Sequence, residues 1–364
     1  MQTHLKLTLV ALLLASSFVT AHAQNKKGSA AKEARTPADI EAATRLQIFL
    51  DRANFSPGKL DGYYGDFTLK ALAMYRESRG EQAPSAPAKP NAAPDVTGLD
   101  LASVDPVFVS YTVTDADLQN VGELPESVPA KAKLKMLPYS DAAEAIAEKF
   151  HCDRDFLEQI NPGKTKAIKA GDQLQVPNVE PFEVATVKEL KPGSEIAPPA
   201  ANDIGEGETG GAADDKSGAS KGTEGGPASP AVSVKVDTGT NMLGVYDADR
   251  LVAAYPVTIG SGRTESPVGE WKVKGVAKMP NFRHDEKMLK EGERSDDFHM
   301  LAPGPNNPVG VIWIALNKKG IGLHGTDDPD SIGRSVSHGC VRLANWDVVR
   351  LAMRLKGGVP VAIR

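Results

Sequence analysis

The chain has 364 residues, which is too long for one ordinary hydrophobic core and predicts two or three domains joined by linkers. Its formal net charge of -5 gives no reason to expect the dense basic face that nucleic-acid binding requires, so we expect no nucleic-acid partner. A polymer of sugars and peptides remains compatible with this charge.

Residues 1–23 have the pattern of a secretory signal peptide. Two basic side chains, His4 and Lys6, precede an apolar run from Leu7 to Leu14, and Ala21-His22-Ala23 precedes Gln24. A buried N-terminal helix is the alternative, but it does not explain this order. The apolar run is shorter than the roughly 20 residues of a membrane helix, so we expect no integral membrane segment after signal removal. We expect export to the periplasm or cell wall.

Two helical stripes separated by turns predict a small helical unit at residues 37–80. The stripes and turns contain Leu46, Phe49 and Leu50, then Ser56-Pro57-Gly58 and Asp61-Gly62, then Leu69 and Leu72. The segment resembles the peptidoglycan-binding helical module. The resemblance rests on Gln47, Pro57-Gly58, Asp61-Gly62-Tyr63-Tyr64-Gly65 and Thr68. The alternative is a helical hairpin without a ligand.

Residues 81–106 are interpreted as a linker, and a second unit is predicted at residues 107–180. Its elements follow the order strand, helix, helix, strand. They lie at Tyr111 to Val113, Ala142 to Phe150, Asp155 to Ile160, and Gln173 to Pro177. This order resembles the LysM glycan-binding module, with a long insertion between residues 114 and 139. The alternative is a degenerate module kept for packing.

Residues 192–230 contain few large apolar side chains, and we expect a flexible tether that lets the N-terminal units concentrate the last domain on a polymer. In residues 231–364, alternating apolar residues such as Val232, Val234 and Val236 predict a mainly β domain with one or two helices. The last helix is predicted from Trp346, Val349, Leu351 and Met353, before Gly357-Gly358.

The chain contains two cysteines, Cys152 and Cys340. An exported protein can join such a pair in a structural disulfide. We instead interpret Cys152 as a small buried apolar residue, because Cys340 lies in a motif that needs a free thiol.

The strongest chemical signal is Ile321-Gly322-Leu323-His324-Gly325-Thr326 followed by Ser337-His338-Gly339-Cys340-Val341-Arg342-Leu343. A thiol attacks a carbonyl carbon as the thiolate, and histidine is suited to accept its proton near neutral pH. The two motifs resemble the catalytic domain of the L,D-transpeptidase family over residues 231–364. That resemblance implies a mainly β sandwich or barrel.

The resemblance also implies a role for each residue of the motifs. Cys340 is the nucleophile and His324 its base, and the residue after it, Gly325, leaves a backbone carbonyl to orient the ring. Backbone N–H groups around Gly339 and Cys340 bind the oxyanion, and His338 supports the loop. Ser337, Arg334 and Arg342 are expected to bind substrate, although a structural salt bridge is equally compatible with either arginine.

The family's reaction is acyl transfer on peptidoglycan stem peptides, with release of D-Ala and no cofactor. The acceptor is an amine of a second stem, a lysine of a wall-linked protein, or water, which would make the chain a carboxypeptidase. A cysteine wall hydrolase and a non-catalytic wall-binding protein are two further possible functions. A metal site at His324, His338 and Cys340 is disfavoured because the sequence offers no second ligand pair. Residues 281–303 are interpreted as a lid or as a solvated insertion.

Overall fold

The computed structural model describes residues 35–83, 89–190, 232–260, 266–334 and 339–364. The chain divides into a unit at Met1–Thr36 and a compact unit at Pro37–Arg364. The predicted signal peptide, the 192–230 tether and part of the 81–106 linker lie outside the described residues. No helix within the described segments is both long and apolar enough to cross a membrane.

The predicted helices of residues 37–80 are α1 (Pro37–Arg52) and α2 (Asp66–Ser78). Their apolar stripes pack together, and Leu46, Leu50 and Leu72 are fully buried. The buried Gln47 amide organises the turn between the helices, since it donates to Asp61 and accepts from the N–H of Gly62. The two helices lie where the apolar stripes predict them. The likeness to the peptidoglycan-binding module and the binding of a ligand stay predictions.

The second unit has the expected strand, helix, helix, strand order. Its main elements are β1 (Phe108–Thr112), α5 (Ala142–Lys149), α6 (Arg154–Ile160) and β2 (Gln173–Pro177). Strands β1 and β2 pair antiparallel. The insertion holds two short helices, two 3-10 turns flank the unit, and a third 3-10 turn lies between α6 and β2. These are α3 (Asp115–Leu118), α4 (Val128–Lys131), η1 (Leu101–Ser103), η2 (Thr165–Ala167) and η3 (Val184–Glu189).

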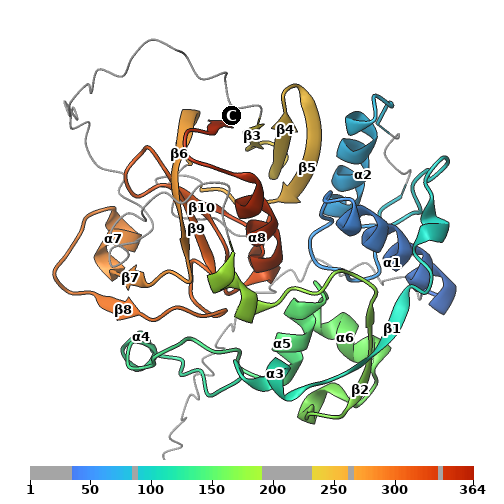
Figure 1. Ribbon diagram of the computed structural model, residues 1–364, viewed down its shortest axis with the longest axis horizontal. Coiled ribbons are helices and arrows are strands. Elements are labelled where there is room, and N and C mark those ends of the chain that lie inside the picture. Colours follow the sequence, from blue (N-terminus) through green and yellow to red (C-terminus); the bar gives the residue numbers. More distant parts are fainter. Residues whose placement is uncertain (1–34, 84–88, 191–231, 261–265, 335–338) are drawn as a thin grey trace, which may run out of the picture. The chain divides into compact units, whose positions relative to one another are not determined.

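The C-terminal domain is mainly β, as expected (Figure 1). An eight-stranded sheet has the order β11-β10-β9-β6-β12-β3-β4-β5. The strands are β3 (Val232–Asp237), β4 (Met242–Asp247), β5 (Arg250–Pro256), β6 (Gly269–Lys278), β9 (Ile312–Leu316), β10 (Gly322–His324), β11 (Val341–Arg342) and β12 (Pro360–Ile363). Thr258, just after β5, bridges Arg342 in β11, so the two edges of the sheet meet.

The 281–303 stretch is folded. Strands β7 (Phe282–His284) and β8 (His299–Leu301) pair antiparallel, and α7 (Glu286–Glu291) lies between them. Asp285 is fully buried, caps α7 at Met288 and accepts from Arg283. The segment thus has an internal framework, and its role as a lid or insertion stays open.

Helix α8 (Asn345–Arg354) is the predicted last helix. Trp346 and Leu351 are buried, but Met353 is 51% exposed, so the expectation that Met353 belongs to the apolar face is wrong. The helical period puts position 353 on the opposite side from positions 348 and 351. The 3-10 turn η5 (Pro329–Ser331) lies in the loop between β10 and β11.

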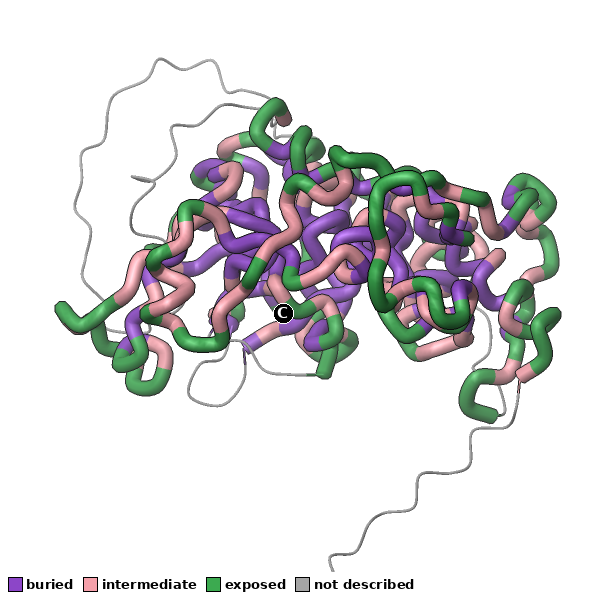
Figure 2. The backbone as a smooth tube through the Cα atoms, turned by 90° about the horizontal axis from the view of Figure 1, so that it is seen from below, coloured by how far each residue is buried: buried purple, intermediate pink, exposed green. Residues whose placement is uncertain are grey.

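The second unit and the C-terminal domain share one hydrophobic core. Leu137, Tyr139, Phe182 and Val187 belong to the same buried cluster as the sheet residues around Ile314. Figure 2 shows the buried backbone, in purple, inside a layer of exposed turns. The first helical unit also packs on the C-terminal domain, since Leu46, Leu50 and Leu72 share a buried cluster with Met242 and Leu251. The domain bounds and the 192–230 tether stay predictions.

Candidate active site

His324 is the last residue of β10 and is fully buried. Its Nδ1 lies 2.6 Å from the carbonyl oxygen of Gly325. A carbonyl oxygen only accepts, so Nδ1 carries the proton. In the neutral ring, Nε2 then holds the lone pair that a general base needs. The group that orients this ring is a backbone carbonyl, in agreement with the glycine at position 325.

The Trp313 indole stacks on one face of the His324 ring and holds the ring in place. The two rings stack with centroids 5.3 Å apart and an interplanar angle of 16°, and Trp313 pairs with His324 across β9 and β10. A Cβ atom at Gly322 would lie 2.8 Å from the indole, so the ring occupies the space a side chain would need there. Trp313 is itself buried.

Cys340 directly precedes β11, which runs parallel to β10. The register pairs Leu323 with Val341 and His324 with Arg342, and therefore sets Cys340 beside Gly322. Residues two apart on a strand point to the same face, so the register predicts that Cys340 shares the face used by His324. The thiol is fully buried and lies 3.4 Å from the carbonyl oxygen of Gly320, to which it donates.

Gly339 has a φ of +109°, a left-handed conformation that strongly favours glycine. This backbone turn immediately before Cys340 explains a glycine at that position. Ser337 and His338 lie outside the described residues. The structure therefore brings together Cys340, Gly339, His324 and Gly325 from two adjacent strands.

The two candidate arginines occupy different surroundings. Arg342 is half-buried beside His324 in the sheet, and its backbone exchanges two hydrogen bonds with Thr258. Arg334 is exposed after η5 and lines a cavity of about 270 Å³. The Thr258 hydroxyl holds this loop, since it donates to the Ser331 carbonyl and accepts from the N–H of Gly333.

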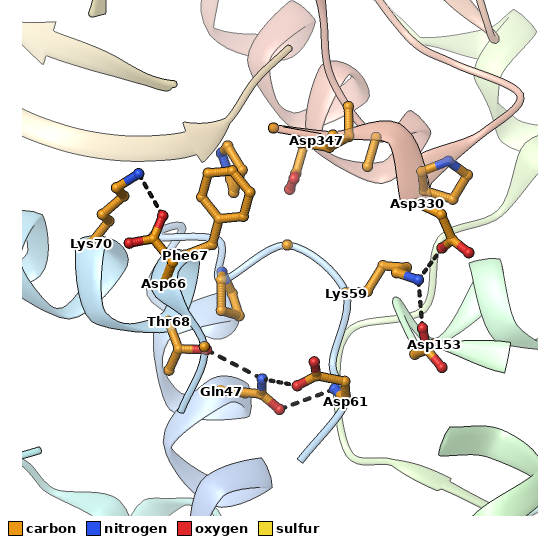
Figure 3. A pocket seen from close by; sticks show the side chains of 18 of the residues that line it. Gln47, Lys59, Asp61, Asp66, Phe67, Thr68, Lys70, Asp153, Asp330 and Asp347 are labelled. Atoms are coloured by element: carbon orange, nitrogen blue, oxygen red, sulfur yellow. Dashed lines mark hydrogen bonds and ion pairs between the residues drawn. The ribbon is translucent and has the colours of Figure 1, made fainter. Parts of the chain in front are cut away.

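That cavity is also lined by residues of the first helical unit (Figure 3). Lys59 bridges Asp153 and Asp330, and Lys70 pairs with Asp66, so both lysines already have carboxylate partners. Asp347 faces the cavity from α8 and accepts a 2.9 Å hydrogen bond from Ser56. Burial raises the pKa of Asp347 to about 8, although the positive charge of Arg350 acts to lower it.

A buried ion pair lies one turn further along α8. Arg350 donates twice to the Asp51 carboxylate, at 2.9 Å each, and His151 lies 3.1 Å from the same group. Burial alone would raise the pKa of Asp51, but Arg350 and His151 hold it below its ordinary value. Burial lowers the pKa of His151, whose ring stacks on Trp346.

Two residues that contact the site indirectly are Asn345 and Glu148. Asn345 accepts from the N–H of Val311 at 3.1 Å and donates to Glu148 at 2.9 Å. The sequence offered no signal for either, because an Asn at a helix start suggests only a cap. Burial raises the pKa of Glu148 to about 7.

Both cysteines lie in described segments and are buried thiols, so they are not joined in a disulfide. Across the described ranges, no three His, Cys, Asp or Glu side chains are grouped closely enough to hold a metal ion.

The C-terminal domain is thus mainly β, with an imidazole on β10 and a thiol directly before the adjacent strand β11. A family model described as the YkuD L,D-transpeptidase catalytic domain matches residues 231–363. The putative L,D-transpeptidase YqjB of Bacillus subtilis is 33% identical over 36% of this chain and 69% of its own length. The chain therefore belongs to the L,D-transpeptidase family.

Other relatives match the same part of the chain. The putative L,D-transpeptidase YkuD of Bacillus licheniformis is 34% identical over 36% of this chain, which spans 64% of that relative. Among solved structures, an Enterococcus faecium L,D-transpeptidase mutant is 18% identical, with a TM-score of 0.30 over 36% of this chain and 49% of that one. The family assignment rests on the sequence relatives.

Proposed function

We propose that the chain is an L,D-transpeptidase that acts on peptidoglycan stem peptides through a Cys340 acyl-enzyme. The donor is a tetrapeptide stem that ends in D-Ala. Its scissile carbonyl is on the L side of the diamino acid centre, as the family resemblance implies. The observation that supports the proposal is the pairing of β10 with β11, which brings His324 and Cys340 close together.

The first half-reaction forms a thioester. Nε2 of His324 takes the Cys340 thiol proton, and the thiolate sulfur adds to the donor carbonyl carbon. Backbone N–H groups around Gly339 and Cys340 stabilise the resulting oxyanion. The carbon–nitrogen bond to D-Ala then breaks, and the imidazolium gives its proton to the leaving amine.

The second half-reaction resolves the thioester. An acceptor amine adds to the thioester carbonyl while His324 takes one of its protons, and the thiolate leaves and is reprotonated. The amine of a second stem would give a cross-link, and a lysine of a wall-linked protein would give attachment. Water as acceptor would give an L,D-carboxypeptidase. Arg342, Arg334 and Ser337 are assigned to substrate binding, with the fork of an arginine suited to a carboxylate.

The N-terminal regions fit a role in binding the wall. Residues 37–80 and 107–180 would hold glycan or stem close to the site, and the predicted signal peptide would deliver the protein to the periplasm or cell wall. Since these regions pack on the catalytic domain, they would present the polymer in a defined orientation instead of only raising its local concentration.

Mass spectrometry of stem peptides incubated with the purified mature chain tests the proposal. A cross-linked dimer with loss of D-Ala is the expected product. A trimmed tripeptide without dimer would identify water as the acceptor and favour the carboxypeptidase. Unchanged peptides in the presence of reductant, together with retention on purified wall, would contradict the transpeptidase and favour a wall-binding protein.

A further inference from the structure

Glu148 is a buried acid of α5 whose two oxygens both have partners. One oxygen accepts from the Asn345 side-chain amide at 2.9 Å, and the other accepts from the hydroxyl of Tyr139. The residue is only 8% exposed, and a buried carboxyl group is costly unless it is hydrogen-bonded in this way. The contact with Asn345 links α5 of the second unit to the first residue of α8.

The Asn345 amide is held in one orientation. Its nitrogen donates to Glu148 and to the Pro305 carbonyl at 3.3 Å, while its oxygen accepts from the N–H of Val311 at 3.1 Å. A flipped amide would set its NH2 group against the Val311 N–H and its oxygen against two acceptors. Glu148 is thus one of the two acceptors that fix the amide.

The oxygen of Asn345 packs directly on the backbone that orients the histidine. A Cβ atom at Gly325 would lie 2.2 Å from this oxygen, and one at Gly310 would lie 2.1 Å from it. Gly310 also has a φ of +63°. Both positions therefore accept only glycine while the amide stays in place. The Gly325 N–H donates to the Ile312 carbonyl at 3.1 Å, and the Gly325 carbonyl oxygen accepts the hydrogen bond from Nδ1 of His324.

We infer that Glu148, acting through Asn345, is a positioning residue for His324. The carboxyl group fixes the amide, the amide fixes the peptide of Gly325, and that peptide's carbonyl fixes the tautomer and angle of the imidazole. The second unit therefore completes the catalytic site in addition to any role in wall binding. This inference rests on the proposed function of His324 as the base.

Three variants of the full mature chain separate positioning from packing. Glu148→Ala removes the acceptor. Glu148→Gln keeps a side-chain oxygen that can accept from Asn345, and the Tyr139 hydroxyl can then accept from the new amide. Ser56→Ala is the matched control, because it removes another buried hydrogen bond to α8, at Asp347, two residues from Asn345.

We expect Glu148→Ala to lower kcat for D-Ala release by roughly tenfold or more with little change in KM, because a misplaced base slows chemistry and not binding. Glu148→Gln should recover most of kcat. Ser56→Ala should lower the denaturation midpoint and leave kcat as in the parent. Equal loss of kcat in Glu148→Ala and Ser56→Ala, or no recovery in Glu148→Gln, would overturn the inference.

A second measurement does not depend on turnover. In protein labelled with 15N-histidine, we expect the His324 ring signals to shift in Glu148→Ala and to stay in place in Ser56→Ala, with no substrate present. Signals unchanged in Glu148→Ala would overturn the positioning role. If the signals shift as expected while even the parent releases no D-Ala, the positioning role is supported and the proposed activity is the part that fails.

Discussion

The strands that carry Cys340 and His324 differ from α8 in what their buried polar groups contact. On β10, the imidazole meets a backbone carbonyl and an indole ring, all within the C-terminal domain. On α8, Asp347 and Arg350 meet Ser56 and Asp51 from the first helical unit. The comparison indicates that chemistry and stability depend on different residues. Asn345 belongs to both sets, because it lies on α8 and packs on the Gly325 peptide beside His324.

Cys340→Ala is expected to show the largest difference between its effect on activity and its effect on stability. Losing the thiol removes the covalent route, so D-Ala release should fall by about 10⁴-fold or to the detection limit. The free energy of unfolding should change by only about 1 kcal/mol, since one sulfur atom leaves a small cavity. Rates of D-Ala release and a urea titration measure the two effects. Substantial release by the variant would contradict the nucleophile assignment.

Arg350→Met is expected to show the opposite pattern, with a large loss of stability and no loss of activity. The variant keeps an apolar side chain of similar length but leaves the Asp51 carboxylate buried without its cation, which costs about 3 kcal/mol. Under conditions where it stays folded, kcat should match the parent. The double variant with Asp51→Asn should regain part of the lost stability, because the isolated charge is then gone. Additive losses in this cycle would show that the pair does not interact.

The pH dependence of stability tests the contribution of Asp347, the buried acid of α8. Burial raises the pKa of Asp347 to about 8 from an ordinary value of 3.8. Above pH 4, the folded state therefore binds more protons at this group than the unfolded state, so its contribution to stability falls as pH rises through 8. Between pH 6 and 8, the contribution of Asp347 to the free energy of unfolding falls by about 2 kcal/mol at most.

Asp347→Asn provides the test, because the amide does not titrate. Denaturant unfolding at pH 6 and pH 8 should show a smaller decline for the variant than for the parent. Glu148, whose pKa burial raises to about 7, adds a decline of the same sign that both proteins share. An equal decline in parent and variant would contradict the raised pKa of Asp347.

The sequence was sufficient for features that depend on neighbouring residues. Period-two apolar residues predicted the C-terminal strands. Turn residues and stripes also predicted α1, α2 and the order of the second unit. In each case, the physical signal lies within a few residues along the chain.

The contacts of α8 could not be predicted, because they join residues far apart in the sequence. The pairs Asp51–Arg350 and Glu148–Asn345 carry no local motif, and each acid alone resembles a solvated helix residue. The shared core around Leu137 was missed for the same reason, since a long polar stretch before residue 231 suggested independent modules. The stacking of Trp313 on His324 could not be predicted either, because it depends on the register of β9 and β10.

The smallest effect on activity is expected for Cys152→Ala. The Cys152 thiol is buried and donates to the Asp153 carbonyl at 3.3 Å, and burial raises its pKa well above the ordinary range. A thiol in that state reacts slowly, whereas a Cys340 thiol that gives its proton to His324 should react first. Cys152→Ala should therefore keep the parent's rate of D-Ala release and the parent's rate of inactivation by iodoacetamide.

Peptide mapping after partial alkylation provides the control, because the fraction of Cys340 modified should equal the fraction of activity lost while Cys152 stays unmodified. The two thiols lie in separate hydrophobic clusters, and they donate to different backbone carbonyls, of Asp153 and of Gly320, so the fold gives them no reason to join. An exported sample whose intact mass shows a complete bond between Cys152 and Cys340, and which is active without reductant, would contradict this argument. It would also remove Cys340 as the nucleophile, since a sulfur held in a disulfide cannot form the thioester.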